Sequence, residues 1–204
     1  MNIKINFKKQ AFSKSNANLI LFADEKFNIT GIKKHITNSE YSYISDLLNK
    51  KDEKKKIVTF SISSKKKIIL VSLKKNLTES ELENLGAKCY VILNEFKEKE
   101  YIINSDTVPS GFKDILGYFC HGIKLKSYKF EKYKTTKEKG YISINLIGKD
   151  VPNLKDQLKF NSIEEGTFYA RDLVSEPGNV LHPDEYAKRI KSLSKLGLRI
   201  KIYN

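Results

Sequence analysis

The segment from Ile68 to Phe96, IILVSLKKNLTESELENLGAKCYVILNEF, carries a strand signal followed at once by a helix signal. Its first six residues form an apolar run of strand length. Thr78-Glu79-Ser80-Glu81 then matches a capping box, in which a threonine and a glutamate three residues later bind each other's backbone N–H groups. The segment therefore predicts a strand, a turn and an amphipathic helix, whose apolar stripe is Leu82, Leu85, Cys89, Ile92 and Phe96.

Outward from this segment, strands and helices alternate through the first 150 residues. Residues 57–62 and 68–73 are expected to form a β-hairpin, with the lysine-rich runs 50–56 and 65–67 as solvated turns. This alternation predicts the α/β class, with a mixed or parallel sheet covered by helices on both faces. Further strands are expected at 3–7, 18–22, 101–104 and 141–147, and further helices at 39–49 and 110–125.

The last fifty residues have a different organisation. A long helix is expected from 153 to 174, and Glu176-Pro177-Gly178-Asn179 interrupts it. A second helix is expected from Pro183 to about Leu196, ended by Gly197. Residues 198–203 are expected to start a strand. Because no later segment of the chain offers this strand a partner, we expect it to begin a second, truncated domain.

The composition indicates a globular protein with a real core. Of the 204 residues, 40% are hydrophobic and 30% charged, and no run of 18 apolar residues is long enough to cross a membrane. Residues 1–14 lack the apolar stretch of a secretory signal, so we expect a cytoplasmic protein. Cys89 and Cys120 lie in apolar contexts and are expected to be buried free thiols. Together with His35, His121 and His182 they form no metal-ligand spacing.

The net charge of +14 raises the alternative of nucleic-acid binding. The segment 124–139 interleaves Tyr128, Phe130 and Tyr133 with seven lysines, which suits base stacking and phosphate neutralisation. The competing interpretation is an extended edge with its rings packed inward. Lysine also dominates the basic residues, whereas arginine, the preferred residue for bidentate phosphate recognition, occurs only three times. We therefore favour a solvated lysine-rich surface.

No familiar catalytic motif occurs in the chain. Glycine-rich phosphate loops, Gly-x-Ser-x-Gly and His-Glu-x-x-His are all absent. The acidic pairs Asp24-Glu25, Glu164-Glu165 and Asp184-Glu185 are expected to be solvated or to complement helix dipoles. His121 is expected to be a structural histidine and His182 to precede a helix. The residues alone thus indicate an α/β domain without a recognisable active site.

One segment is more specific. Residues 170–183, ARDLVSEPGNVLHP, resemble the segment that joins the two domains of the cytosolic leucine aminopeptidases, whose pattern is Ala-Arg-Asp-Leu-Val-Asn-Glu-Pro-x-Asn-x-Leu-Thr-Pro. Twelve of fourteen positions fit, and Ser175 and His182 depart from it. Residues 127–134, SYKFEKYK, resemble the family's Ser-Tyr-x-Phe-x-x-Tyr-Lys stretch. The resemblance is strong at 163–183, moderate at 120–135 and weak before residue 60.

The resemblance implies a three-layer, macro-like N-terminal domain at 1–150, a linking helix at 151–176 and the beginning of a peptidase domain at 177–204. In that family a complete subunit binds two divalent metal ions, typically manganese or zinc, and removes N-terminal amino acids from peptides. The subunits usually assemble into a hexamer. These properties are implied for a full-length parent of this chain.

The family's metal ligands lie in segments resembling Asp-Ser-Gly-Gly, Met-Lys-x-Asp-Met and Asn-Thr-Asp-x-Glu-Gly-Arg, and none occurs in residues 1–204. No catalytic, metal-binding or substrate-binding residue is therefore assigned to this chain, which is predicted to be inactive alone and to serve assembly and active-site shaping. Sequence-tolerant DNA binding is the alternative, and a nucleotide-derived ligand is a third. The matched residues Arg171, Asp172, Glu176, Pro177 and Asn179 are expected to be structural.

Overall fold

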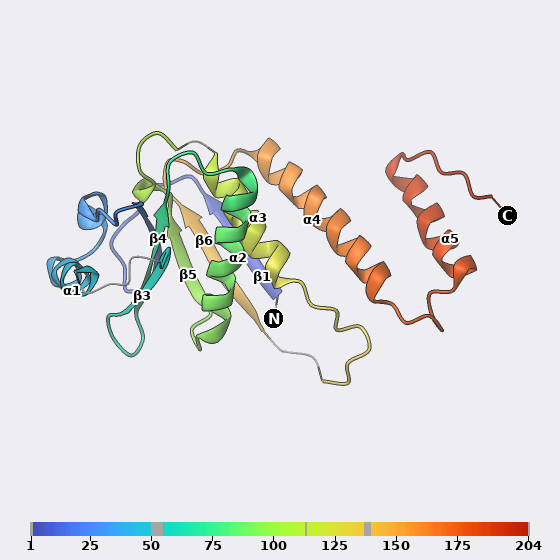
Figure 1. Ribbon diagram of the computed structural model, residues 1–204, viewed down its shortest axis with the longest axis horizontal. Coiled ribbons are helices and arrows are strands. Elements are labelled where there is room, and N and C mark those ends of the chain that lie inside the picture. Colours follow the sequence, from blue (N-terminus) through green and yellow to red (C-terminus); the bar gives the residue numbers. More distant parts are fainter. Residues whose placement is uncertain (1, 50–54, 113, 137–139, 204) are drawn as a thin grey trace.

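The computed structural model describes residues 2–49, 55–112, 114–136 and 140–203. Its centre is a six-stranded sheet in the order β1-β6-β5-β2-β4-β3 (Figure 1). All neighbouring strands are parallel except the β3–β4 hairpin, so the sheet is mixed. The strands are β1 (Asn2–Lys8), β2 (Asn18–Asp24), β3 (Ile57–Ser61), β4 (Lys67–Leu73), β5 (Glu100–Asn104) and β6 (Tyr141–Ile147).

Helices cover both faces of the sheet. One face carries α2 (Glu79–Glu95) and α3 (Ile115–Ser127), and the other carries α1 (Asn38–Leu48) with the 3-10 helix η1 (Thr30–His35). A shorter 3-10 helix, η2 (Ser105–Thr107), follows β5. Thr37 and Thr78 form complete capping boxes at the starts of α1 and α2. The expected three-layer α/β/α architecture is confirmed.

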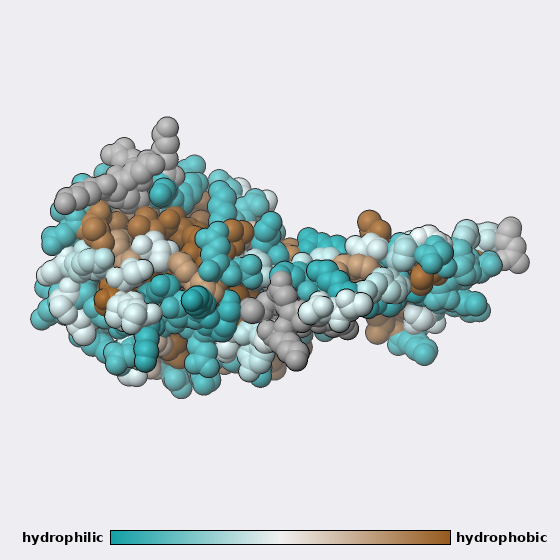
Figure 2. All heavy atoms as spheres, turned by 90° about the horizontal axis from the view of Figure 1, so that it is seen from below, coloured by the Kyte–Doolittle hydropathy of each residue, from teal (hydrophilic) through white to brown (hydrophobic). Residues whose placement is uncertain are grey.

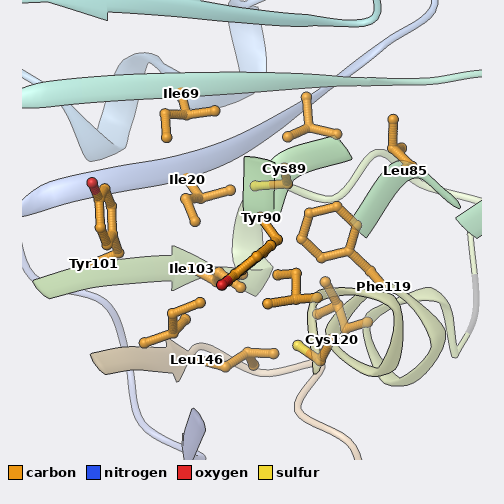
Figure 3. Packing of buried hydrophobic residues seen from close by; sticks show 14 of the residues in the cluster. Ile20, Ile69, Leu85, Cys89, Tyr90, Tyr101, Ile103, Phe119, Cys120 and Leu146 are labelled. Atoms are coloured by element: carbon orange, nitrogen blue, oxygen red, sulfur yellow. The ribbon is translucent and has the colours of Figure 1, made fainter. Parts of the chain in front are cut away.

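The alternation of side chains along the central strand β2 explains the two cores. Leu19 and Leu21 join the cluster beneath η1 and α1, whereas Ile20 and Phe22 join the larger cluster beneath α2 and α3. Figure 3 shows Ile20 in this larger cluster. All four side chains are almost inaccessible to water. Because helices cover both faces of the sheet at β2 and β4, side chains on both sides of these strands are buried. Both strands are therefore almost continuously hydrophobic in sequence.

Two glycines let α2 and α3 approach each other at backbone distance. A Cβ atom on Gly86 would lie 2.0 Å from the Phe119 carbonyl oxygen, and one on Gly122 would lie 1.9 Å from the Glu83 carbonyl oxygen. Neither contact is possible with any larger residue unless a helix moves. Between the helices Cys89 and Cys120 are buried free thiols, as expected (Figure 3). Burial raises the pKa of the Cys120 thiol to about 12.

The C-terminal part leaves this body as a slender projection (Figures 1 and 2). It contains α4 (Leu154–Ser175), α5 (Pro183–Ser192) and the 3-10 helix η3 (Leu193–Leu196). The first part of α4 packs on α3, with Phe160 against Tyr118 and His121. No residue of α5 is buried. Apolar side chains stand exposed along the projection (Figure 2). Among the most exposed are Val174, Tyr186 and Leu196.

Four local expectations are corrected. Residues 198–203 form no strand, because no described segment offers them a partner ladder. The helix expected at 110–125 begins at Ile115, after Gly111 and Asp114 with positive φ. The helix after Pro183 turns into η3 at Leu193. Lys66, expected in a solvated turn, is buried and pairs with Glu40 at 2.6 Å. The expected turn at 50–56 lies largely outside the described residues.

Candidate functional site at the joint between α4 and α5

The segment that resembles the aminopeptidase joint lies where α4 ends and α5 begins. Pro177 disfavours helical geometry at Glu176, so α4 ends at Ser175 with the Glu176 N–H bound to the Asp172 carbonyl. The Pro177 carbonyl then accepts hydrogen bonds from the N–H groups of Val180 and Leu181. This compact turn leads to Pro183 in the first turn of α5.

Glu176 is the centre of the joint. Its side chain is 1% exposed, and its carboxylate accepts hydrogen bonds from Lys132, Tyr133 and Arg189. The Arg189 Nη1–Glu176 Oε1 distance is 2.9 Å. These donors, Lys132 first, lower the pKa of Glu176 to about 2. One ionised carboxylate therefore ties together three segments that are distant in sequence.

Residues 128–134, here called the strap, bring two of these partners. The Tyr128 hydroxyl donates to Asp172 Oδ1 at 2.7 Å, and its ring packs against Phe168 of α4 with centroids 5.2 Å apart. From α4, Arg171 donates to the Leu125 carbonyl at 2.7 Å and lies over the Tyr128 ring. The strap is a loop bound along the second half of α4. It is not the extended edge that one interpretation of 124–139 expected.

Arg189 connects α5 to the joint. Its guanidinium binds Glu185 of α5 at 3.0 Å as well as Glu176, and its carbonyl accepts a hydrogen bond from Tyr169 of α4 at 3.0 Å. The strap, the end of α4 and Arg189 enclose a hollow of about 530 Å³. Arg189 thus makes hydrogen bonds both to Glu176 at the joint and to Tyr169 of α4.

The residues that match the family pattern differ in their contacts at the joint. Arg171, Asp172, Glu176 and Pro177 make the contacts that shape the joint, whereas Asn179 is exposed. His182, which stands where the family pattern has threonine, makes no side-chain cap bond to α5. Lys132, Tyr133 and Arg189 were not identified as partners of Glu176 from the sequence. The resemblance of 127–134 was the available signal for the first two.

The other candidate residues, His121 and the possible metal ligands, lie outside the joint. His121 is buried, and its Nδ1 lies 2.8 Å from Glu83 Oε1 between α3 and α2. In the described ranges, no three His, Cys, Asp or Glu side chains come together as ligands for a metal ion. This donor arrangement does not fit a two-metal centre, so no metal-dependent step is assigned to these residues. No described helix has the length and apolar character needed to cross a membrane.

Comparisons with known proteins agree on one kind of enzyme. A probable cytosol aminopeptidase of Clostridium perfringens is 27% identical over 97% of this chain and 42% of its own length. One of Wolbachia pipientis is 30% identical over 70% of this chain and 29% of its own length. One of Bradyrhizobium is 44% identical over 47% of this chain. No protein-family model matches the chain.

A solved structure has the same fold. A tomato leucine aminopeptidase mutant superposes with a TM-score of 0.71 at 14% sequence identity, over 96% of this chain and 42% of that chain. The chain thus spans less than half the length of the relatives that it matches.

Proposed function

Because this chain is homologous to the cytosol aminopeptidases over most of its length, we propose that it forms the non-catalytic, N-terminal part of a leucyl aminopeptidase. The observation that carries the proposal is the alignment over 97% of the chain, together with the 170–183 match at the joint. The complete enzyme would remove N-terminal amino acids from peptides with two divalent metal ions, manganese or zinc, held by residues beyond this chain. Its subunits would form a hexamer in the cytoplasm.

The proposed division of the chain is a macro-like domain at 1–150, a linking helix at 151–176 and the start of the peptidase domain at 177–204. The surface of α5 supports this division. Tyr186, Ile190 and Leu193, the first residue of η3, recur at helical spacing; Tyr186 is exposed, and Ile190 and Leu193 are only half-buried. Such a stripe is normally covered by a packed partner. In our proposal the rest of the peptidase domain provides that cover.

The joint suggests how this part contributes to catalysis without performing it. Glu176 binds Arg189 of α5 and also Lys132 and Tyr133 of the strap, so it connects α5 to the segment bound along α4. Since α5 would open the peptidase domain, these bonds would set the position of that domain against the body. Catalytic geometry is sensitive to displacements of about 1 Å, so a rigid joint would shape the active site from outside it.

The gene beyond codon 204 gives a direct test. We expect it to encode segments resembling Asp-Ser-Gly-Gly, Met-Lys-x-Asp-Met and Asn-Thr-Asp-x-Glu-Gly-Arg, which supply the carboxylates of a two-metal centre. A continuation without such acidic segments would contradict the proposed parent enzyme. If the continuation contains them, Glu176→Gln can be tested in the complete enzyme. We expect this variant to have a lower kcat than the wild type.

The isolated chain gives a second test. Purified residues 1–204, incubated with manganese or zinc and leucyl anilide, should release no aniline above the rate of buffer with metal. A full-length aminopeptidase assayed in parallel serves as the positive control. Turnover that persists through stringent purification and disappears with a chelator would show that the chain carries its own active site.

A further inference from the structure

A second hollow lies on the body, away from the joint. It has a volume of about 710 Å³ and sits beside the carboxyl ends of β2 and β4 and the first turns of α2. Four exposed lysines from three separate segments line it. Lys55 and Lys56 precede β3, Lys74 follows β4, and Lys88 belongs to α2.

In the described part of the chain, the ammonium groups of these four lysines are not held by acidic partners. Within the described ranges, none of the four ammonium groups makes an ion pair. By contrast, Lys66 pairs with Glu40, Lys124 with Glu164 and Lys132 with Glu176. In the segment 124–139, which the sequence suggested as an anion-binding surface, the Lys132 charge is thus neutralised by Glu176, whereas the described residues form no such pair with the four lysines of this hollow.

Two acidic residues also line the hollow and do not cancel its charge. Glu81 is held in the capping box by the N–H and hydroxyl of Thr78. Those two bonds lower the pKa of Glu81, and the positive charges of Lys74 and Lys56 add to the effect. Glu25 is exposed on the loop after β2. Four lysines against two carboxylates leave the lining with a net charge of +2.

From this geometry we propose that the hollow is a binding site for a small anion carrying two or more phosphate groups. Ammonium groups arriving from three directions suit a multivalent anion, because a single ligand then relieves the repulsion among all of them. The volume lies within the range of small-molecule sites, about 300–1,000 Å³. Asn84 adds an amide donor, and Leu77 and Leu85 supply an apolar wall. The carboxyl ends of parallel strands are also where open α/β sheets bind ligands. The proposal does not depend on the peptidase assignment.

The test uses inorganic tripolyphosphate as the probe, with isothermal titration calorimetry at constant ionic strength. We expect saturable binding to the wild-type chain. The double variant Lys74→Gln/Lys88→Gln should weaken it by about tenfold or more, since charge-assisted hydrogen bonds are lost. The double variant Lys155→Gln/Lys195→Gln removes the same charge from the projection and should leave the affinity within about twofold.

Three results would overturn the proposal. The first is no saturable binding at about 100 mM salt, where nonspecific attraction is screened. The second is an equal loss in both double variants, which would mean a diffuse charge effect. The third is a short DNA duplex that binds more tightly than tripolyphosphate and loses affinity in the hollow variant, which would identify a nucleic-acid surface. Circular dichroism establishes that both double variants are folded.

Discussion

Glu176 illustrates what one residue can do when three donors surround it. Its carboxylate is nearly inaccessible, yet it remains ionised because Lys132, Tyr133 and Arg189 bind the charged form. The sequence match indicated that Glu176 is structural. It did not identify the partners, because the strap and α5 meet α4 only through the tertiary fold.

Acidification should release this bond network. The pKa of Glu176 falls from 4.5 to about 2 on folding, so the ionised group stabilises the folded state fully above about pH 4.5. That contribution should be lost as the pH falls towards 2. The difference in unfolding free energy between wild type and Glu176→Gln should therefore be greatest at pH 5–7 and shrink between pH 4.5 and 3. Urea titrations across pH measure it, and a constant difference would contradict the assignment.

Gly122 should tolerate no side chain. Gly122→Ala places a Cβ atom 1.9 Å from the backbone oxygen of Glu83, so α3 must shift from α2. We expect the unfolding free energy to fall by about 1–3 kcal/mol. The control Gly166→Ala, on an open face of α4, should instead stabilise the chain by about 0.5–1 kcal/mol through lower backbone entropy of the unfolded state. Urea denaturation compares them, and similar values would argue against the close helix crossing.

At the scale of elements, the sequence predicted a helix end correctly where a capping or breaking residue marks that end. The capping box at Thr78 and the breaker at Pro177 both mark real helix ends. Boundaries set by tertiary contact were missed. Asp114 adopts a left-handed conformation that delays α3, and Lys66 is drawn from its turn by Glu40 on α1. No propensity of these residues reveals such partners.

The cap of α2 offers an element-scale prediction. Thr78→Ala removes the acceptor of the Glu81 N–H and one donor to the Glu81 carboxylate. The unfolding free energy should fall by about 1 kcal/mol. Ser80→Ala, in the first turn of the same helix, should change it by less than about 0.5 kcal/mol. Thermal or urea unfolding distinguishes them; an equal effect of both variants would mean that the box adds nothing.

At the start of α5 a cap can be added, whereas the previous variant removes one from α2. His182 provides no side-chain cap, so His182→Thr should supply an acceptor for the first N–H groups of α5. Amide hydrogen exchange in α5 should slow by an amount equivalent to about 0.5–1 kcal/mol. His182→Ala serves as the control and should leave the exchange unchanged. Slowing in both variants would indicate that removal of the imidazole, and not capping, is the cause.

At the scale of the whole molecule, the net charge of +14 allowed two interpretations from the sequence, a solvated lysine-rich surface and a DNA-binding surface. DNA binding stays a prediction, and it is measurable as a mobility shift across a salt series. Phosphate contacts weaken steeply with salt. Because Lys132 is paired with Glu176 and the Tyr128 hydroxyl binds Asp172, we expect no shift at about 100 mM salt. A shifted complex that persists there would restore the alternative function.

The pairing of β1 with β6 has a consequence for the order in which the chain folds. β1 precedes the other strands of the sheet in the chain, yet its neighbour in the sheet is β6, with Ile3 opposite Ile142. Closing so long a loop is slow. During synthesis, β2 and β4 can assemble with α2 while the first strand waits outside the growing sheet. Its apolar residues are then available to other nascent chains, and we expect the alternating polar residues Lys4, Asn6 and Lys8 to oppose premature association.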